Sequence, residues 1–232
     1  MSINTSVIDL GGSLVAPDGV DTVFLKGFRE CIVEYLGAEE SSRIIIVCGG
    51  GQLARAYQKT YRSLVDDAQS HAADWIGIAA TRLNAELLRH LFGSLCLDEV
   101  VHDPTAVRQF TGRILLAAGW KPGVSTDYDA VVLAERFSAA TIIDLSNIPK
   151  VYTADPKRDP RAKPIDTISW KDYRALVEDR WEPGKNVPFD SEATKRAAQN
   201  GLKVIVTDGR DLANLRNILA NNRFAGTTIG PE

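Results

Sequence analysis

Cysteine is scarce in this sequence, and positive charge is not in excess. The three cysteines, Cys31, Cys48 and Cys96, are odd in number and scattered among apolar residues. This pattern argues against a disulfide or zinc framework and is typical of reduced core thiols. The formal charge of −3, from 27 Lys and Arg against 30 Asp and Glu, argues against a polyanion-binding surface. We therefore expect no nucleic-acid partner.

Long hydrophobic runs are also missing. No apolar stretch approaches the roughly 20 residues that a membrane span needs, and no basic-then-apolar leader opens the chain. These absences predict a cytoplasmic protein with no membrane partner. The sequence contains no internal repeat and no low-complexity tract. With 232 residues, 44% of them hydrophobic, it is long enough for one sizeable α/β domain or two small lobes that share a sheet.

The most informative stretch runs from an apolar strand into three glycines and a helix. Ile44 to Cys48 is rich in β-branched residues, which predicts a strand buried on both faces of a parallel sheet. Gly49 to Gly51 then offer bare backbone amides at the start of a helix that includes Gln52. This arrangement favours a bound phosphate, and Arg55, one turn into the helix, can add a bidentate donor. The alternative is that the glycines only form a tight turn.

A second unit of the same kind precedes the first. Ser6 to Leu10 predicts a strand, Gly11 to Ser13 a glycine turn, and Asp21 to Leu36 a helix. Two such turns at the ends of parallel strands would face one crevice, where open α/β sheets bind ligands. Neither turn has the G-x-G-x-x-G spacing, and G-x-x-x-x-G-K-[ST] does not occur. The sequence thus argues against a dinucleotide-binding Rossmann domain and a P-loop NTPase.

The rest of the chain alternates between predicted helices and strands. Helices are expected over 54–65, 72–92, 129–137, 169–177, 191–200 and 211–219, with a short one at 103–104. Strands are expected over 97–101, 113–116, 141–145, 202–207 and 226–229. The polar loops 146–157 and 181–190 are typical of binding loops, and the proline-rich segment 156–164 is expected to separate two lobes. Ser169 and Asp190 are expected to be helix N-caps.

Polar residues occur inside the apolar helix predicted over 72–92. Asp74, Thr81, Arg82 and Asn84 would need partners if they were buried. The alternative is that Asp74 caps the helix and the other three lie on a solvated face. The loop 119–127 also carries small and hydroxyl residues that can offer amides and hydroxyls to a ligand, although Thr126 or Asp127 could simply be an N-cap.

Four stretches, taken in order, carry a resemblance to a known family. They are D-L-G-G-S at 9–13, V-C-G-G-G-Q-L-A-R-A-Y at 47–57, D-W-I-G-I-A-A-T-R-L-N-A at 74–85 and V-Y-T-A-D-P-K at 151–157. In this order they resemble the uridylate kinases of the amino-acid-kinase superfamily, especially the archaeal-type branch. The resemblance extends through P-G-V-S-T-D, P-F-D and the terminal G-T-T-I, and so covers essentially the whole chain.

The resemblance implies a fold and a reaction. The fold would be a three-layer αβα sandwich with a mainly parallel central sheet, as one amino-acid-kinase domain over 1–232. Its N-lobe, about 1–138, would bind UMP, and its C-lobe, about 139–232, would bind ATP. The enzyme would transfer the ATP γ-phosphate to UMP in pyrimidine nucleotide synthesis. Mg²⁺ would enter with ATP, held mainly by the nucleotide phosphates, and the assembly would be a homohexamer.

The resemblance also assigns site residues. The catalytic step would involve Arg55, Lys195, Gly12 and Gly51. UMP would be bound by Gly50, Asp74, Trp120, Lys121, Pro122, Gly123, Val124, Ser125 and Thr126. ATP would be bound by Gly12, Ser13, Gly51, Arg55, Ser146, Asn147, Tyr152 and Asp155. Such a site suits phosphoryl transfer, which needs positioning and charge neutralisation more than covalent chemistry.

Departures from the family pattern affect particular contacts. Asp9 stands where many relatives carry a lysine, although the archaeal-type branch also has Asp there. A phosphate-binding cation is then missing, and Lys195 is our candidate to supply it; Lys150 and Lys157 are the alternatives. Pro149 and Lys150 also replace the usual Asp-Gly of the adenine-side loop. The acceptor loop is altered at Ala118, Val124 and Ser125.

Two other functions remain open on the sequence alone. The same fold could phosphorylate a carboxylate, a carbamate or isopentenyl phosphate, although Asp74 with Thr81 and Arg82 favours a nucleotide. The chain could also be a non-catalytic binding protein, because this fold serves in molybdenum storage. Arg55 and Lys195 argue against that second alternative.

Overall fold

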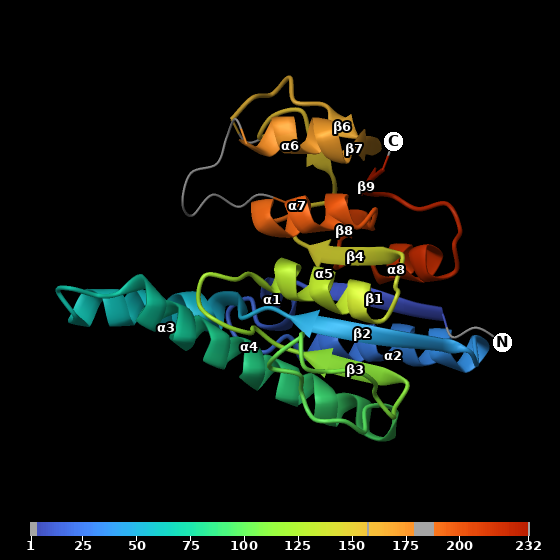
Figure 1. Ribbon diagram of the computed structural model, residues 1–232, viewed down its shortest axis with the longest axis horizontal. Helices are drawn as coiled ribbons and strands as arrows, with labels where there is room; N and C mark the ends of the chain where they lie inside the picture. Colours follow the sequence, from blue (N-terminus) through green and yellow to red (C-terminus); the bar gives the residue numbers. More distant parts are fainter. Residues whose placement is uncertain (1–3, 157, 179–187, 232) are drawn as a thin grey trace.

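The structure is a computed structural model that describes residues 4–156, 158–178 and 188–231. Within these residues, seven strands form one central sheet in the order β3-β2-β1-β4-β8-β9-β7 (Figure 1). The strands are β1 (Asn4–Leu10), β2 (Ser42–Cys48), β3 (Ile114–Ala117), β4 (Thr141–Ser146), β7 (Thr167–Ser169), β8 (Lys203–Asp208) and β9 (Thr227–Gly230). Neighbouring strands are parallel except β8 and β9. The predicted mainly parallel sheet is confirmed.

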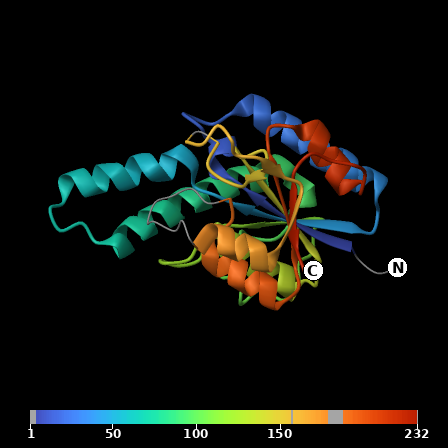
Figure 2. The same ribbon diagram turned by 90° about the horizontal axis from the view of Figure 1, so that it is seen from above.

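Helices cover both faces of this sheet, as Figure 2 shows. They are α1 (Gly12–Val15), α2 (Thr22–Ala38), α3 (Gly51–Leu64), α4 (Ser70–Phe92), α5 (Thr126–Arg136), α6 (Trp170–Glu178), α7 (Ser191–Gln199) and α8 (Leu212–Leu219). Helices α2, α4 and α8 pack on one face, and α5, α6 and α7 pack on the other. The predicted αβα sandwich is therefore confirmed. Helices α3 and α4 together extend beyond the sheet as an arm.

Alternation of side chains along the strands divides the core into two. In β1, Ile8 and Leu10 pack against the α2, α4 and α8 layer, whereas Val7 packs against the α5, α6 and α7 layer. Because successive side chains of a strand point to opposite faces, Asp9 shares the face of Val7. A carboxyl group thus lies under α5 on a face of the sheet that is mostly apolar.

The predicted strand at 97–101 is wrong. Only Val101 pairs with the sheet, through a single bridge to Ala117. The side chain of Asp98 instead accepts hydrogen bonds from the amides of Thr111 and Gly112, at 2.7 and 3.2 Å, which holds the segment as a loop. The expected short helix at 103–104 is also wrong, since Asp103 accepts from the Thr105 amide at 2.8 Å and forms a turn.

The helix caps were only partly foreseen. Asp190 accepts from the amides of Glu192 and Ala193, and Ser169 accepts from that of Asp172, so both predicted caps are confirmed. Helix α5 is capped by neither Thr126 nor Asp127. Its cap is Ser125, whose hydroxyl accepts from the Tyr128 amide at 3.2 Å.

Short strands flank the proline-rich segment 156–164, and the sequence did not suggest them. Val151–Tyr152 (β5) pairs antiparallel with Pro164–Ile165 (β6), and β7 follows two residues later. The three cysteines are buried free thiols, as predicted. Among the described residues, no helix is both long and apolar enough to cross a membrane.

Candidate active site

The two glycine turns meet above the carboxyl ends of β1 and β2. These strands are parallel neighbours with Leu10 opposite Cys48, so the turns emerge side by side. A Cβ added to Gly12 would lie 2.2 Å from the Gly51 nitrogen, and Gly51 itself has φ of 64°. Only glycine allows this backbone-to-backbone packing. The triple glycine is therefore more than a tight turn, because it forms one wall of a crevice with the turn after β1.

Arg55 lies at this crevice, as its spacing predicted. It is in the second turn of α3, and its Nη2 donates to the Ser13 hydroxyl at 3.1 Å, while its Nε donates to Gln52 at 3.0 Å. Its side chain is exposed. The structure thus brings together Gly12, Ser13 and Arg55 from segments about 40 residues apart in the chain, a spacing with no local sequence signal.

The crevice lies where the strand order reverses. The chain leaves β1 for β2 and β3 on one side, and it returns through β4 and β8 on the other side of β1. The Gly11 amide donates to the Leu145 carbonyl at 2.8 Å, so the loop that follows β4 adjoins the first glycine turn. Ligands of open α/β sheets bind at such a switch point. Ser146 and Asn147 are both predicted to bind ATP; Ser146 is the last residue of β4, and Asn147 begins this loop.

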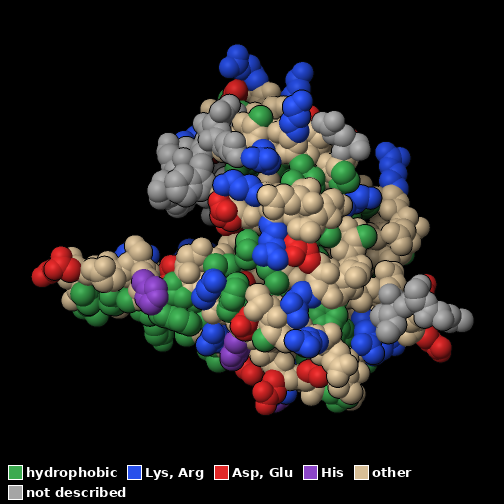
Figure 3. Space-filling model, viewed as in Figure 1, with side chains coloured by type: hydrophobic (Ala, Val, Ile, Leu, Met, Phe, Trp, Pro, Cys, Tyr) green, Lys and Arg blue, Asp and Glu red, His purple; other side chains and the backbone are tan. Residues whose placement is uncertain are grey.

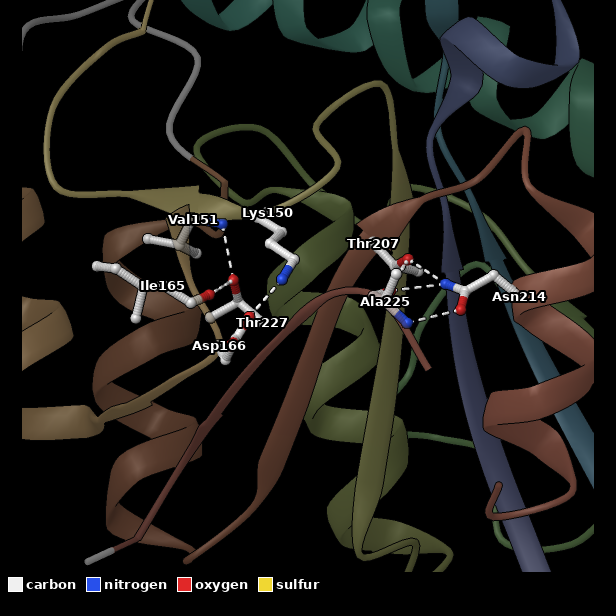
Figure 4. A network of polar contacts seen from close by, with 8 residues as sticks. All are labelled: Lys150, Val151, Ile165, Asp166, Thr207, Asn214, Ala225 and Thr227. Carbon is white, nitrogen blue, oxygen red and sulfur yellow. Dashed lines mark hydrogen bonds and ion pairs between the residues drawn. The ribbon is translucent and has the colours of Figure 1, made fainter. Parts of the chain in front are cut away.

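The loop after β4 is anchored to β9 and to the residue between β6 and β7 (Figure 4). Lys150 forms an ion pair with Asp166, and the Val151 amide donates to the Thr227 hydroxyl at 2.9 Å. A separate cluster holds the chain before β9, where Asn214 contacts both Thr207 and Ala225. Lys150 is thereby engaged in fixing the loop. The other alternative cation, Lys157, lies outside the described residues.

Two further residues assigned to ATP lie beyond this anchor. Tyr152 is half-buried in β5. Asp155 is in the turn after β5, where its carboxylate lies 3.6 Å from the guanidinium of Arg158. The described contacts do not join either residue to the glycine turns, so their assignment stays a prediction.

Helix α4 holds the opposite wall, which contains the acceptor loop. Asp74 accepts from the Gly123 amide at 2.9 Å, and the Thr81 hydroxyl accepts from the Gly119 amide at 2.8 Å. Arg82 donates to the Trp120 carbonyl at 3.4 Å. These contacts join residues that are 38 to 49 positions apart in the chain, and they place the loop 119–123 beside the helix.

Two alternative readings of this helix are therefore wrong. Asp74 does not cap α4, because the helix begins at Ser70. Thr81 and Asn84 do not face solvent either, since they are 7% and 3% exposed. Asn84 donates to the Gly49 carbonyl at 3.0 Å and so also braces the triple-glycine turn. Buried polar side chains need such partners, and that requirement was the sequence signal.

The acceptor loop itself is partly open. Gly123 and Lys121 are exposed, and the Lys121 ammonium lies 3.8 Å from the ring centroid of Trp120. The other positions assigned to UMP in this loop are half-buried: Trp120, Pro122, Val124, Ser125 and Thr126. Gly50, assigned to the same ligand, lies at the N-cap of α3, where a Cβ would meet that of Ala54 at 2.6 Å.

Lys195 is located one turn into α7. Its Nζ donates to Glu192 at 2.7 Å, and the side chain is 44% exposed. Most of the loop that precedes this helix, residues 181–187, lies outside the described residues. The helix packs on α5, where Arg196 forms an ion pair with Glu135 at 2.7 Å. The contacts described here do not bring Lys195 to the glycine turns, so its role stays a prediction.

A group of buried carboxyls under α5 was not foreseen. Asp9 of β1 and Asp144 of β4 are 3% and 6% exposed, and Asp129 of α5 is fully buried. Asp127, at the start of α5, accepts from the Asp190 amide at 2.7 Å. Burial is the largest cause that raises the pKa of each, to about 6 for Asp127 and about 7 for Asp129. An aspartate inside the apolar strand T-I-I-D-L was the available signal.

The fold and the paired glycine turns agree with a family match. Residues 4–208 match the Amino acid kinase family, and the chain belongs to it. Among named relatives, the uridylate kinase of Methanospirillum hungatei is 35% identical over 228 residues, which cover 97% of this chain and 94% of the relative. The uridylate kinase of Thermoplasma acidophilum is 34% identical over 229 residues, covering 97% and 96%.

Solved structures give the same result. The crystal structure of uridylate kinase from Archaeoglobus fulgidus matches with a TM-score of 0.82 and 32% identity, and the match covers 97% of this chain and 99% of that one. UMP kinase from Bacillus anthracis, at 21% identity and a TM-score of 0.77, shares the fold. The resemblance predicted from the four sequence stretches is confirmed.

Proposed function

We propose that this protein transfers the γ-phosphate of ATP to UMP, giving UDP and ADP for pyrimidine nucleotide synthesis. One observation carries the proposal: two glycine turns pack backbone to backbone between a loop braced by α4 and a loop anchored after β4. Two substrates that approach from these opposite sides would meet at bare amides. The uridylate kinase relatives support the choice of UMP as acceptor.

The residues would act mainly by positioning and by charge. The amides of Gly12 and Gly51, together with Arg55, would meet negative charge that spreads over the transferred phosphoryl oxygens. Lys195 would add a mobile ammonium from α7. The N-lobe, about 1–138, would hold UMP through Asp74 and the acceptor loop, with Gly50 facing its phosphate. The C-lobe, about 139–232, would hold ATP through Ser13, Ser146, Asn147, Tyr152 and Asp155.

Magnesium would enter with ATP. Its preferred ligands are oxygens, and the nucleotide phosphates supply them, so that it neutralises charge between the phosphates. The groups at the crevice fit this arrangement, because backbone amides and Arg55 complement the negative phosphate charge that the magnesium ion would not neutralise. These residues would hold and orient the phosphates.

We also propose that the protein assembles as a homohexamer in the cytoplasm. Large apolar side chains are exposed on and beside the α3–α4 arm, including Val20 at 52%, Tyr57 at 64% and Leu83 at 61%. Figure 3 shows hydrophobic side chains spread along this arm. Patches of this kind mark contact surfaces. Light scattering coupled to size exclusion would give the assembly mass, and a monomer would contradict this part of the proposal.

A scan of acceptors tests the activity. ATP and magnesium are supplied with UMP, dUMP, CMP, AMP, acetylglutamate, carbamate or isopentenyl phosphate, and both ADP release and the phosphorylated product are measured. UMP should give the highest kcat/KM, with UDP as product. Turnover of isopentenyl phosphate or a carboxylate in preference to UMP would assign another acceptor. Absence of ADP release with every acceptor would indicate a binding protein.

A further inference from the structure

Two buried carboxyls lie side by side on neighbouring strands. Asp9 and Asp144 are direct partners in the parallel register of β1 and β4. Each belongs to the face that packs under α5, because Val7 and Ile142, two residues earlier in each strand, lie in that half of the core. Both carboxyls therefore point into the same confined space below the start of α5.

The surroundings supply carboxyls in place of cations. Within the described chain, Asp9 Oδ2 and Asp144 Oδ2 have no hydrogen-bond partner. Asp127 raises the pKa of Asp9 through its charge and through side-chain hydrogen bonding, and the charge of Asp127 also raises the pKa of Asp144. The described residues include no group of three or more side chains arranged to bind a metal ion. Among the described residues that shift the pKa values of Asp9 and Asp144, none carries a positive charge that would offset the burial of two ionised carboxylates.

The other described titratable groups near Asp9 and Asp144 add no positive charge. Asp129 of α5 raises the pKa of Asp9. The Cys48 thiol of β2 lies in the other half of the core, and its pKa is raised by burial and by Asp9. Tyr173 of α6 is buried, and its pKa is raised by burial and then by nearby carboxylates, including Asp190. Each of these neighbours is neutral or anionic at neutral pH. Protonation is therefore the way in which Asp9 and Asp144 can avoid mutual repulsion.

We propose that Asp9 and Asp144 are positioning residues that remain neutral carboxylic acids in the folded protein, with Asp9 donating its proton to a hydrogen bond with Asp127. Asp127 is where two parts of the site meet: it follows the acceptor loop directly, and it accepts from the Asp190 amide at the start of α7. A neutral Asp9 would also carry no negative charge to repel a phosphate bound at the glycine turn that follows it. The positional part of this inference is independent of the substrate, and its effect on catalysis rests on the proposed function.

The inference fixes the sign of a pH effect. Burial, followed for Asp9 by the charges of Asp127 and Asp144, raises the pKa of both groups above that of the unfolded chain. Unfolding above about pH 5 therefore releases a proton from each neutral carboxyl, because free aspartate has a pKa near 3.9. The contribution of these two carboxyls to the free energy of unfolding is greatest below the pKa of the unfolded chain, and it falls as pH rises towards their folded pKa values. Each retained proton makes the unfolding equilibrium constant increase roughly tenfold per pH unit.

The experiment compares the wild type with Asp144→Asn and Asp67→Asn. The first change replaces a neutral acid by a neutral amide of similar shape, and the second makes the same chemical change at an exposed site in the turn after α3. Urea unfolding is followed from about pH 5 to about pH 8, a range in which the unfolded carboxyls are ionised. Infrared spectroscopy counts protonated carboxyl groups in the folded protein.

Asp144→Asn should lose one protonated-carboxyl band and reduce the slope of log K against pH by about one proton, whereas Asp67→Asn should match the wild type. The kcat of Asp144→Asn near neutral pH should stay within about threefold of the wild-type value. An unchanged slope or an unchanged band would overturn the proposal.

The wild type alone provides a second measurement in case the variant does not fold. Its unfolding at about pH 7 should release protons that a dye can count, and release of none would overturn the inference. Failure of the proposed function would give a different pattern, since UMP turnover would be absent while proton release and the infrared band remained.

Discussion

Replacing Arg55 by alanine gives the sharpest test of the crevice. The guanidinium lies above both glycine turns, where its Nη2 donates to the Ser13 hydroxyl at 3.1 Å. Because the side chain is exposed, its loss should change the free energy of unfolding by no more than about 1 kcal/mol. In the transition state, however, charge spreads over the transferred oxygens, and a preorganised donor acts most strongly there.

The expected effect on the reaction is large. Losing one such donor costs roughly 2 to 4 kcal/mol of transition-state stabilisation, or about 30- to 1000-fold in kcat/KM. Initial rates of UDP formation would be measured against UMP at saturating ATP, and against ATP at saturating UMP. Arg62→Ala is the matched control, because Arg62 is an exposed arginine two turns further along α3, in its last turn. That variant should keep wild-type kinetics.

A small effect would refute this reasoning. If Arg55→Ala reduces kcat/KM by less than about threefold while the fold is intact, Arg55 contributes no phosphate contact to the mechanism. A comparable loss in Arg62→Ala would instead show that the charge of α3 as a whole matters, and not the placement of Arg55.

Three further predictions concern the two walls and α7. Asp74 should select a ribose, because a carboxylate accepts hydrogen bonds from sugar hydroxyls. The kcat/KM for dUMP should therefore be lower than that for UMP. Equal kcat/KM values for the two substrates would leave Asp74 only its bond to the Gly123 amide. Lys195→Ala should lower kcat far more than it raises the KM for UMP, and Lys195→Arg should restore kcat only in part. A near-normal kcat of Lys195→Ala at saturating substrates would show that Lys195 does not stabilise the transition state. Asn84→Ala should lower the free energy of unfolding by about 1 to 3 kcal/mol, because the buried Gly49 carbonyl loses its hydrogen-bond donor. A decrease of less than about 0.5 kcal/mol, measured by urea unfolding, would contradict a stabilising role for that bond.

The elements around the crevice could be predicted because their signals are local. The apolar runs of β1, β2, β4 and β8 are strands in the structure, and glycine turns follow β1 and β2 as expected, although the short helix α1 at Gly12–Val15 was not foreseen. Side-chain periodicity and turn chemistry depend on residues within a few positions of one another. The order of four short motifs then predicted the family, which the relatives confirm.

Local signals failed where a distant segment decided the conformation. The segment 97–101 has an apolar pattern, yet the Asp98 carboxylate binds amides of residues 111 and 112 and holds it as a loop. Asp127 looked like an N-cap, but Ser125 takes that position and Asp127 accepts from the Asp190 amide instead. In both cases a polar side chain found its partner more than ten residues away.

The sequence by itself determined the buried strands β1, β2, β4 and β8, the glycine turns and the family of this protein. The tertiary structure decided which polar groups became buried and with what partners: Thr81 and Asn84 against the two loops, and Asp9 beside Asp144 under α5. Periodicity along a chain specifies the face on which a side chain lies. The environment on that face depends on sheet order and register, which join strands more than a hundred residues apart. This environment determines whether a carboxyl holds its proton.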